Sequence, residues 1–574
     1  MVRPGPVLLG RPVPLDCRAL QVRGPGGLEA PLQWKPVDFL PAGGACFRWA
    51  RIAWIAPRPG VYRLLAGRVS SKGGDPPQRE PLEGWLPSRV FLEGRPCPGR
   101  EGSSWRGPVL AERVLQGWGP PGAGLAWTLT SQTWATGEER LTFRLARAGE
   151  GPPGVGEVLV PLPRGERDWF VLRGGGRVEA GLWRVLPEKN EMRPGEIWEG
   201  RLLGRPPGAH GPPPRWGWGD QPWEDPGKLC GLPLPGKPVL LLPAGRGPLG
   251  SQDRALGKAL GKLLERSLSW KDPRDRGDLR DKRGEWTNLE FDLPWALVLQ
   301  YLRTGNPLYL EGARSCLAHL NSTDRAWLDR PGETSGLFLV HGRDHRGNGT
   351  ETGHAWIQGM LAAALLAGDR DLLGQCASTV RALVLAVQDR GMGGVSRCLG
   401  WPGLALATWL EFTRDPPAAK ALGLLAGLTS RSWAPRAGAF LLPGDRAGFH
   451  RWVIPLWVQA GLLGRLALLG DPRRDWSARC GLLLAPPGWR RRIPPAVLVY
   501  REGSPPRASR PCALSKLALA LEGTAWIAGS TRAWRKGAHL LARGLEKALR
   551  RADAREVTLL GRAWPVVAAR LLSR

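Results

Sequence analysis

Two short polar segments hold most of the residue types in this chain that could do chemistry. One runs from Trp286 to Asp292 and the other from His341 to Trp356, and each leads directly into an apolar run with helical spacing. Imidazole and carboxylate groups placed before a helix can act as general acids and bases. The candidate catalytic residues are therefore His354, His345, Glu351 and Glu290.

In the first segment, Trp286, Asn288, Glu290 and Asp292 alternate with mostly apolar residues. An extended chain places alternate side chains on one side, so we expect these four to face a common ligand. The indole of Trp286 offers a flat apolar platform for a pyranose ring. The alternative is that Asp292 only caps the following helix, with Pro294 in its first turn, and that Glu290 only faces water.

The second segment is predicted to be a loop, because four glycines lie between His341 and Trp356. The spacing of His341 and His345 would bring two metal ligands together only on a helix, which the glycines oppose. Arg343 and Arg346 also disfavour a bound cation, so we predict no metal site and no cofactor, and a guanidinium instead suits the carboxylate of an acidic sugar. The expected substrate-binding residues are Trp286, Asn288, Asp292, His341, Arg343, Arg346 and Trp356.

His354 differs from the other histidines of this segment. It is expected in the first turn of the following helix, where the positive end of the helix dipole favours neutral imidazole. Neutral imidazole is the form that a general base requires. Glu351 could orient the ring or cap the helix. The alternative is that His354 is a packing residue, since histidine is intermediate in its preference for burial.

The period of the apolar residues changes along the chain and predicts four parts. Residues 1–75 and 76–205 are expected to be an N-terminal β-domain and a second β-sandwich domain, with strands near 31–34, 47–55, 126–130 and 141–145. Residues 206–250 are rich in proline and glycine and read as a connector. Residues 251–574 have helical spacing and would carry the site.

The helical part is interrupted at intervals that suit a helical hairpin and its return loop. The breaks lie at 304–307, 367–369, 414–416, 470–472 and 528–530. Each joins a turn residue to a helix-capping residue. Roughly a dozen helices fit, and His450-Arg451-Trp452 is expected to open one of them. The predicted fold class is multidomain β + α, with N-terminal β-sandwich-type domains followed by a C-terminal (α/α)6-like toroid; an open α-solenoid is the alternative.

The net charge of +30 does not by itself indicate a nucleic-acid partner. Arginine, glycine, proline and tryptophan are all abundant, as a GC-rich coding sequence would produce, and the basic residues are spread along the chain without a nucleic-acid motif. A basic protein still attracts anionic ligands, acidic polysaccharides among them.

Three further features bear on location. No apolar run is long enough to span a membrane, and proline and glycine interrupt the apolar start of the chain, so no export signal is recognised. The nine cysteines are scattered, without a C-x-x-C pair, which is typical of a reducing compartment. We therefore expect a cytoplasmic protein that meets short oligosaccharides, so exo action is favoured over attack on polymer.

The sequence TNLEFDLPWALVLQYLRTGNPLYLEGA (Thr287–Ala313), followed by GHAWIQGMLAAALLAGDRDLL, resembles the C-terminal toroid of the exo-rhamnogalacturonan lyase and YetA-like family. The stretch EAPLQWKPVDFLPAGGACFRWARIAW resembles the first β-domain of that family. The resemblance implies two β-domains before a toroid, and a lyase acting on a rhamnogalacturonan-like glycan. It carries over no catalytic assignment.

Three functions from different classes fit these residues. A lyase for uronic-acid-containing glycans would use His345 or His354 as base or acid and Arg343 or Arg346 to pair with the sugar carboxylate. A glycoside hydrolase would need two carboxylates flanking the bond, chosen from Glu290, Asp292 and Glu351. A non-catalytic carbohydrate-binding or scaffold protein would keep the toroid alone. The expected partner in each case is a carbohydrate, with an anionic oligosaccharide favoured.

Overall fold

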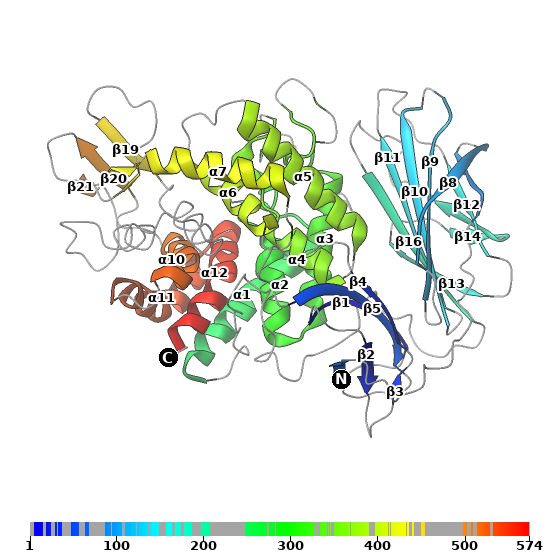
Figure 1. Ribbon diagram of the computed structural model, residues 1–574, viewed down its shortest axis with the longest axis horizontal. Coiled ribbons are helices and arrows are strands. Elements are labelled where there is room, and N and C mark those ends of the chain that lie inside the picture. Colours follow the sequence, from blue (N-terminus) through cyan, green and yellow to red (C-terminus); the bar gives the residue numbers. More distant parts are fainter. Residues whose placement is uncertain are drawn as a thin grey trace.

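The computed structural model describes the strands of the N-terminal part, one large sheet and most of the helical part (Figure 1). The described residues are 5–14, 19–23, 29–30, 32–36, 47–56, 63–67, 87–206, 247–434, 439–440, 449–453, 497–501, 507–508 and 514–572, with gaps inside the three long ranges. Most of the predicted connector at 206–250, and the break at 470–472, lie outside them.

The first strands form two small antiparallel sheets. One has the order β1 (Gly5–Pro14), β5 (Phe47–Ala56) and β4 (Leu32–Pro36), and the other has β3 (Glu29–Ala30), β2 (Ala19–Arg23) and β6 (Arg63–Gly67). Strands β4 and β5 occupy the two runs predicted in this part of the sequence. Strand β1 lies against helix α4 (Gln358–Ala367), so these strands pack next to the helices (Figure 1).

The next ten strands form one antiparallel sheet in the order β13-β16-β11-β10-β9-β8-β7-β12-β15-β14. Their bounds are β7 Arg89–Leu92, β8 Arg95–Trp105, β9 Leu110–Trp118, β10 Leu125–Trp134, β11 Glu139–Arg147, β12 Val158–Pro161, β13 Asp168–Arg173, β14 Arg177–Glu179, β15 Leu182–Val185 and β16 Ile197–Arg205. Buried and partly exposed residues alternate along β10, as expected when one face of a strand covers a core.

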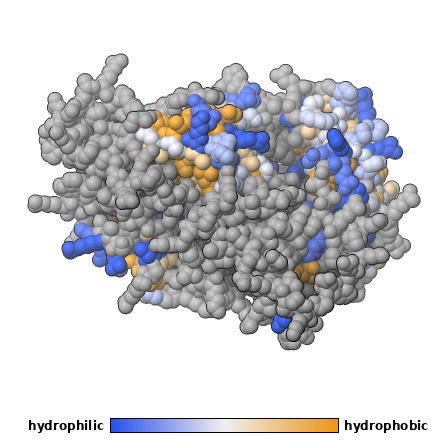
Figure 2. Space-filling view, viewed as in Figure 1, coloured by the Kyte–Doolittle hydropathy of each residue, from blue (hydrophilic) through white to orange (hydrophobic). Residues whose placement is uncertain are grey.

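One hydrophobic core joins the two halves of this sheet. It contains Val90 and Trp183 from the β7–β14 half together with Leu129 and Phe143 from the β8–β13 half. The visible face of the sheet is mainly hydrophilic, although Trp118 and Val171 are exposed, whereas apolar residues gather over α6 and α7 (Figure 2). The sheet therefore holds its own core, apart from that of the helices.

Glu139, at the start of β11, gives this sheet a predicted pH dependence. Its carboxylate is buried, accepts a hydrogen bond from Thr133 Oγ1 at 3.0 Å and lies 3.7 Å from Arg167. Burial raises the pKa of Glu139 to about 7 despite these two partners, whereas an unperturbed glutamate titrates at 4.5. Between those values the folded chain keeps a proton that the unfolded chain releases, so stability should fall as pH rises from about 4.5 to 7 and then level off.

Glu139→Gln should remove this loss of stability at higher pH. We expect the free energy of unfolding of the sheet to rise by about 3 kcal/mol at pH 8 and to change little at pH 4.5, from the size of the raised pKa. Denaturant unfolding at the two pH values measures this, with Glu179→Gln on the exposed strand β14 as control. An equal effect of Glu139→Gln at both pH values would contradict the assignment.

Ten α-helices are described after residue 247. They are α1 Gly250–Leu268, α2 Leu293–Thr304, α3 Pro307–Ser322, α4 Gln358–Ala367, α5 Arg370–Asp389, α6 Ser396–Leu410, α7 Pro416–Arg431, α10 Leu514–Ala528, α11 Arg532–Arg551 and α12 Ala554–Leu572. Strands β1 to β16 therefore precede the helices, as the change in apolar period predicts, whereas further short strands after α7 were not predicted.

The helices lie in two layers (Figure 1). Helices α10, α12, α2, α4 and α6 pack each against the next as an inner arc, and α11, α1, α3, α5 and α7 cover them as an outer arc. Helices α2 and α4 are buried almost throughout, whereas the outer helix α1 alternates buried and exposed residues. A helix that is apolar on all sides belongs in a core, which explains the layering. The closure of the predicted ring between α7 and α10 falls mostly on residues outside those described.

Local signals set the helix ends. Gly305 ends α2 in the left-handed conformation (φ 68°), and the side chain of Asn306 then caps α3 ahead of Pro307. Asp415 caps α7 in the same way, accepting the backbone N–H of Ala418 at 3.1 Å. These breaks lie where the sequence predicts them.

The helix expected at His450-Arg451-Trp452 is a strand instead. Residues Phe449–Val453 form β19, which pairs antiparallel with β20 (Val497–Arg501), and β21 (Arg507–Ala508) completes the sheet. Aromatic and β-branched residues in this stretch favour an extended chain. A two-stranded pair, β17 (Trp433–Ala434) and β18 (Ala439–Phe440), also follows α7. None of the described helices combines the length and the apolar character that crossing a bilayer requires.

Candidate functional site

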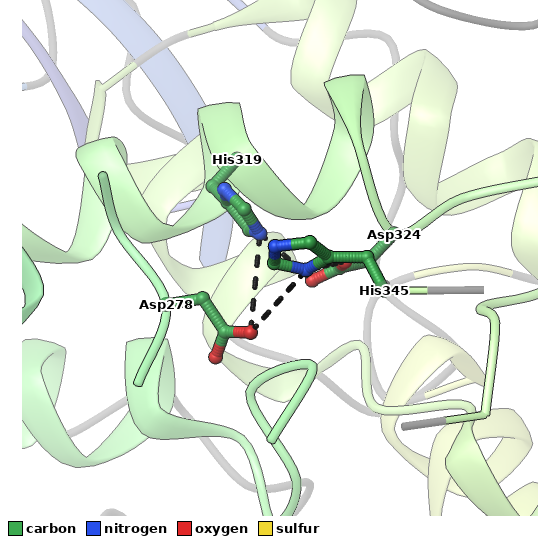
Figure 3. Close-up of side chains that lie close together, drawn as sticks. All are labelled: Asp278, His319, Asp324 and His345. Atoms are coloured by element: carbon green, nitrogen blue, oxygen red, sulfur yellow. Dashed lines mark hydrogen bonds and ion pairs between the residues drawn. The ribbon is translucent and has the colours of Figure 1, made fainter. Parts of the chain in front are cut away.

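Two groups of polar and aromatic side chains stand out in the helical part. The inner site contains Phe291, Glu351, His354, Trp356, Gln358, Trp401, Glu522 and Arg562. The His–Asp cluster contains Asp278, His319, Asp324 and His345 (Figure 3). The polar segments predicted from the sequence contribute to both groups and contact one another.

Residues at the start of the inner helices α2, α4 and α6 build the aromatic wall of the inner site. Phe291 precedes α2, Trp356 precedes α4, and Trp401 lies in the first half of α6. Their ring centroids are 6.1–6.5 Å apart. The indole Nε1 of Trp356 is buried and has no hydrogen-bond partner among the described residues. The wall therefore carries a donor that a ligand could satisfy.

His354 and Glu351 form a pair beside this wall. The imidazole Nδ1 lies 3.0 Å from Glu351 Oε2, and the ring meets Trp356 edge-on at 5.1 Å. His354 is buried, while the Glu351 side chain is partly exposed. A carboxylate this close to Nδ1 would favour a proton on that nitrogen and leave Nε2 to accept one.

The sequence predicts His354 in the first turn of α4, but the structure places it before that helix. It ends a short 3₁₀ turn, η4 (Thr352–His354), and Ala355 then leaves the helical conformation (ψ 89°) before α4 begins at Gln358. The dipole of α4 therefore does not act on this ring in the expected way. Glu351 is the group that orients it.

Arg562 from α12 connects the inner helices at the centre of the site. Its guanidinium binds Glu522 (Nε–Oε2 3.1 Å), Gln358 Oε1 and the Phe291 carbonyl (3.2 Å), and it lies 5.1 Å from the ring of Trp401. The side chain is almost fully buried. Its partners satisfy the charge, so Arg562 holds α2, α4, α6, α10 and α12 together around the site.

Asp292 is the N-cap of α2, as the alternative reading of the sequence has it. Its carboxylate accepts the backbone N–H of Trp295 at 3.1 Å and of Gly359, in α4, at 3.0 Å. Burial raises the pKa of Asp292 although Arg562 and the two N–H groups lower it. A Cβ at position 359 would collide with Trp295 and Asp292, so only glycine fits. Asp292 thus joins two inner helices.

An ion pair joins Glu290, before α2, to the start of α12. Its Oε2 is 2.8 Å from Arg555 Nε, and Arg555 Nη2 also lies 3.5 Å from Asp281. The Arg555 side chain is 23% exposed, so it lies nearer the surface than the almost fully buried side chain of Arg562.

The His–Asp cluster lies on the other side of the segment that precedes α2. Asp278 comes from the α1–α2 connection, His319 from the last turn of α3, Asp324 from just after α3, and His345 from the segment before η4 (Figure 3). Asp324 contacts both rings, at 3.0 Å from His345 Nδ1 and 3.1 Å from His319 Nε2. Asp278 Oδ2 is 3.7 Å from His345 Nδ1 and 4.0 Å from His319 Nε2.

The two buried carboxylates of the cluster differ in their surroundings. Burial and the charge of Asp324 raise the pKa of Asp278. Burial also acts to raise the pKa of Asp324, but His319 and His345 outweigh it and lower that pKa below its ordinary value. Asp324 is therefore the carboxylate most strongly coupled to the two imidazoles.

Trp286 lies in this cluster's wall. Its ring stacks on His345 at a centroid distance of 4.2 Å, and the guanidinium of Arg280 lies 4.3 Å from the ring centroid. The ring is only 2% exposed. Trp286 therefore packs around His345 in this structure.

Asn288 connects the cluster to the inner site. Its backbone N–H donates to Asp278 Oδ2 at 3.1 Å, and its side-chain amide donates to the carbonyls of Leu339 and His345. Asn288, Leu289, Phe291 and Asp292 all have positive φ values, between 44° and 73°. Such strain in non-glycine residues persists only where surrounding contacts impose it. These contacts place Phe291 and Asp292 for the inner site.

The remaining predicted residues are placed as follows. Arg343 is exposed and has no ion pair with any described residue, and the adjacent Gly342 accepts a hydrogen bond from the backbone of Trp286 at 2.9 Å. His341 and Arg346 lie outside the described residues.

Sequence reasoning missed several residues of both groups. Three of them, Arg562, Glu522 and Trp401, come from helices far along the chain. For Arg562 and Glu522, the signal in the sequence is a charged residue inside a largely apolar helix. Asp278 lies before α2 and Asp324 directly after α3, and neither belongs to a motif.

Comparisons with known proteins give weak structural matches. No family model and no curated protein matches the chain. Among solved structures it is similar to a sugar epimerase from a ruminal bacterium, at 12% identity and a TM-score of 0.39, over 53% of this chain and 85% of that one. It is also similar to Rex8A from Paenibacillus barcinonensis complexed with xylose, at 11% identity and a TM-score of 0.36, over 55% and 94%.

A third match is a reducing-end-xylose releasing exo-oligoxylanase, at 9% identity and a TM-score of 0.35, over 55% of this chain and 95% of that one. At such TM-scores these likenesses add nothing to the reasoning about activity, which rests on the side chains described above.

Proposed function

We propose that this chain is a carbohydrate-active protein, and that it cleaves uronic-acid-containing oligosaccharides by β-elimination at the inner site. The observation that carries the proposal is the Glu351–His354 pair beside the rings of Trp356 and Trp401. Aromatic faces suit sugar rings, and an imidazole oriented by a carboxylate suits proton transfer.

The elimination needs one base and one proton donor. His354 Nε2 takes the proton from the ring carbon next to the sugar carboxylate, and the electron pair forms a carbon–carbon double bond. The glycosidic C–O bond on the neighbouring carbon breaks, and the imidazolium returns the proton to the leaving oxygen. Glu351 holds Nδ1–H throughout, which keeps Nε2 aimed at the substrate.

A cation must neutralise the sugar carboxylate during this step. Arg562 is buried and already bound to Glu522, Gln358 and Phe291, so we assign it to the scaffold. Arg555 on α12 is already paired with Glu290 and Asp281, whereas Arg343 is exposed and has no ion pair with any described residue. A guanidinium binds a carboxylate with two parallel hydrogen bonds, which Arg343 is free to offer.

A hydrolase at the same place would rely on Glu290 or Glu351. Glu290 is ion-paired with Arg555, and Glu351 with His354, which suits carboxylates that hold other groups in place. For this reason elimination is favoured over hydrolysis by paired carboxylates.

Product analysis tests the proposal. The purified chain is incubated with short oligosaccharides that either contain or lack uronic acid, and ultraviolet absorbance and reducing ends are followed together. We expect both signals to rise with uronide substrates and neither with neutral ones. Reducing ends without absorbance would indicate a hydrolase, and binding without either signal would indicate a non-catalytic carbohydrate-binding protein; each result overturns the lyase proposal.

A further inference from the structure

The His–Asp cluster has the composition of a metal site. Two imidazoles and two carboxylates form a mixed nitrogen and oxygen set that suits zinc and neighbouring transition metals, whereas magnesium and calcium prefer oxygen alone. The four potential ligand atoms, one from each residue, lie within 4.8 Å of one another. Two carboxylates and a divalent cation would leave this buried volume neutral.

The spacing of the ligand atoms agrees with a single small ion. A tetrahedron with zinc–ligand bonds of about 2.0–2.2 Å has edges of about 3.3–3.6 Å. His345 Nδ1 lies 3.0 Å from Asp324 Oδ1. With Asp324 Oδ2 and Asp278 Oδ2 as the carboxylate ligand atoms, the other three carboxylate–imidazole distances are 3.1, 3.7 and 4.0 Å. They bracket that edge length, and the side chains of Asp278, His319 and Asp324 are fully buried.

Asp324 supplies an independent indication of a ligand. Its Oδ2 is fully buried and accepts no hydrogen bond, although His319 Nε2 is 3.1 Å away. A buried carboxylate oxygen left without a donor is costly. A cation here would bind this carboxylate oxygen.

Asp275, outside the four residues, orients His345. Its Oδ1 lies 3.3 Å from His345 Nε2, on the side of the ring away from the cluster. A proton held there by Asp275 leaves the Nδ1 lone pair facing Asp278 and Asp324. Carboxylate groups behind metal-binding histidines have this role.

We propose that Asp278, His319, Asp324 and His345 form a closed, four-coordinate site for a divalent transition-metal ion of the zinc type. The ion would join the α1–α2 connection, the end of α3 and the segment before η4. Through Asn288, which hydrogen-bonds to Asp278 and His345, it would also hold the strained segment that presents Phe291 and Asp292 to the inner site. This inference does not depend on the proposed lyase activity.

Metal analysis of the intact chain tests it. The protein is stripped with a chelator, titrated with zinc, and compared with magnesium and calcium titrations. We expect one tightly bound zinc per chain, a melting temperature that falls on chelation and recovers with zinc, and a tetrahedral d–d spectrum when cobalt(II) replaces zinc. The proposal is overturned if the chain binds no stoichiometric zinc and neither chelation nor added zinc changes its melting temperature.

Three variants locate the ion. Asp324→Asn should lose stoichiometric zinc, and Asp275→Asn should weaken zinc binding about 10- to 100-fold, the usual effect of removing a group that orients a metal-binding histidine. His539→Ala, which removes an exposed histidine on α11, should bind zinc like the wild type. Zinc retained in Asp324→Asn, or lost in His539→Ala, would contradict the assignment. If Asp324→Asn fails to fold, the wild-type titration and the cobalt spectrum still decide.

Discussion

His354→Gln is expected to lower turnover of a uronide oligosaccharide about 10²- to 10⁴-fold, the usual contribution of a general acid–base group. Glutamine keeps the size and polarity of the side chain but cannot accept and return the proton. Binding should change much less, because Trp356 and Trp401 remain. Steady-state kinetics with ultraviolet detection of the product measures both quantities.

Two companion variants sharpen this result. Glu351→Gln should retain part of the activity, since an amide oxygen can still accept the Nδ1–H of His354. His539→Gln removes a distant, exposed histidine and should have no effect. Wild-type turnover in His354→Gln, with folding intact, would remove His354 from the mechanism.

Arg303→Met is expected to destabilise the helical part by about 3–5 kcal/mol, the usual cost of leaving one partner of a buried ion pair alone. Arg303 on α2 donates to Asp253 on α1 at 2.6 Å, and Trp564 on α12 donates to the same carboxylate oxygen at 2.8 Å. The Arg303 and Asp253 side chains are at most 3% exposed. The loss arises because Asp253 would keep a buried charge with too few partners.

The double variant Asp253→Leu with Arg303→Met separates charge from packing. It should recover most of the stability, less the hydrogen bond of Trp564, because apolar groups can replace a buried pair at little cost. Denaturant unfolding followed by circular dichroism in the helical band measures all three proteins. A double variant less stable than Arg303→Met alone would show that packing, not the unpaired charge, dominates.

Sequence patterns predict those features of this chain that depend on neighbouring residues. The cap at Asp292, the turn at Gly305 and the strands β10 and β11 follow from local chemistry and from the period of apolar residues. The strand at His450 was missed because its pairing with β20 lies far along the chain.

The two groups of functional residues depend on contacts between distant segments. Arg562 meets Phe291 only because α12 packs against α2, and His345 meets Asp278 and Asp324 only because α3 brings them together. Trp286 was expected to bind sugar because its type suits that role, and its burial against His345 depends on a segment distant in the sequence. No spacing in a single sequence reports these contacts.

The masses of the products from one uronide oligosaccharide test the central claim most directly. Elimination adds no water, so the masses of the two products should sum to the mass of the substrate, with the unsaturated uronide in one of them. Hydrolysis adds one water across the broken bond, so product masses exceeding the substrate by one water would contradict the lyase account. The same reaction with His354→Gln should yield the elimination products only at a greatly reduced rate.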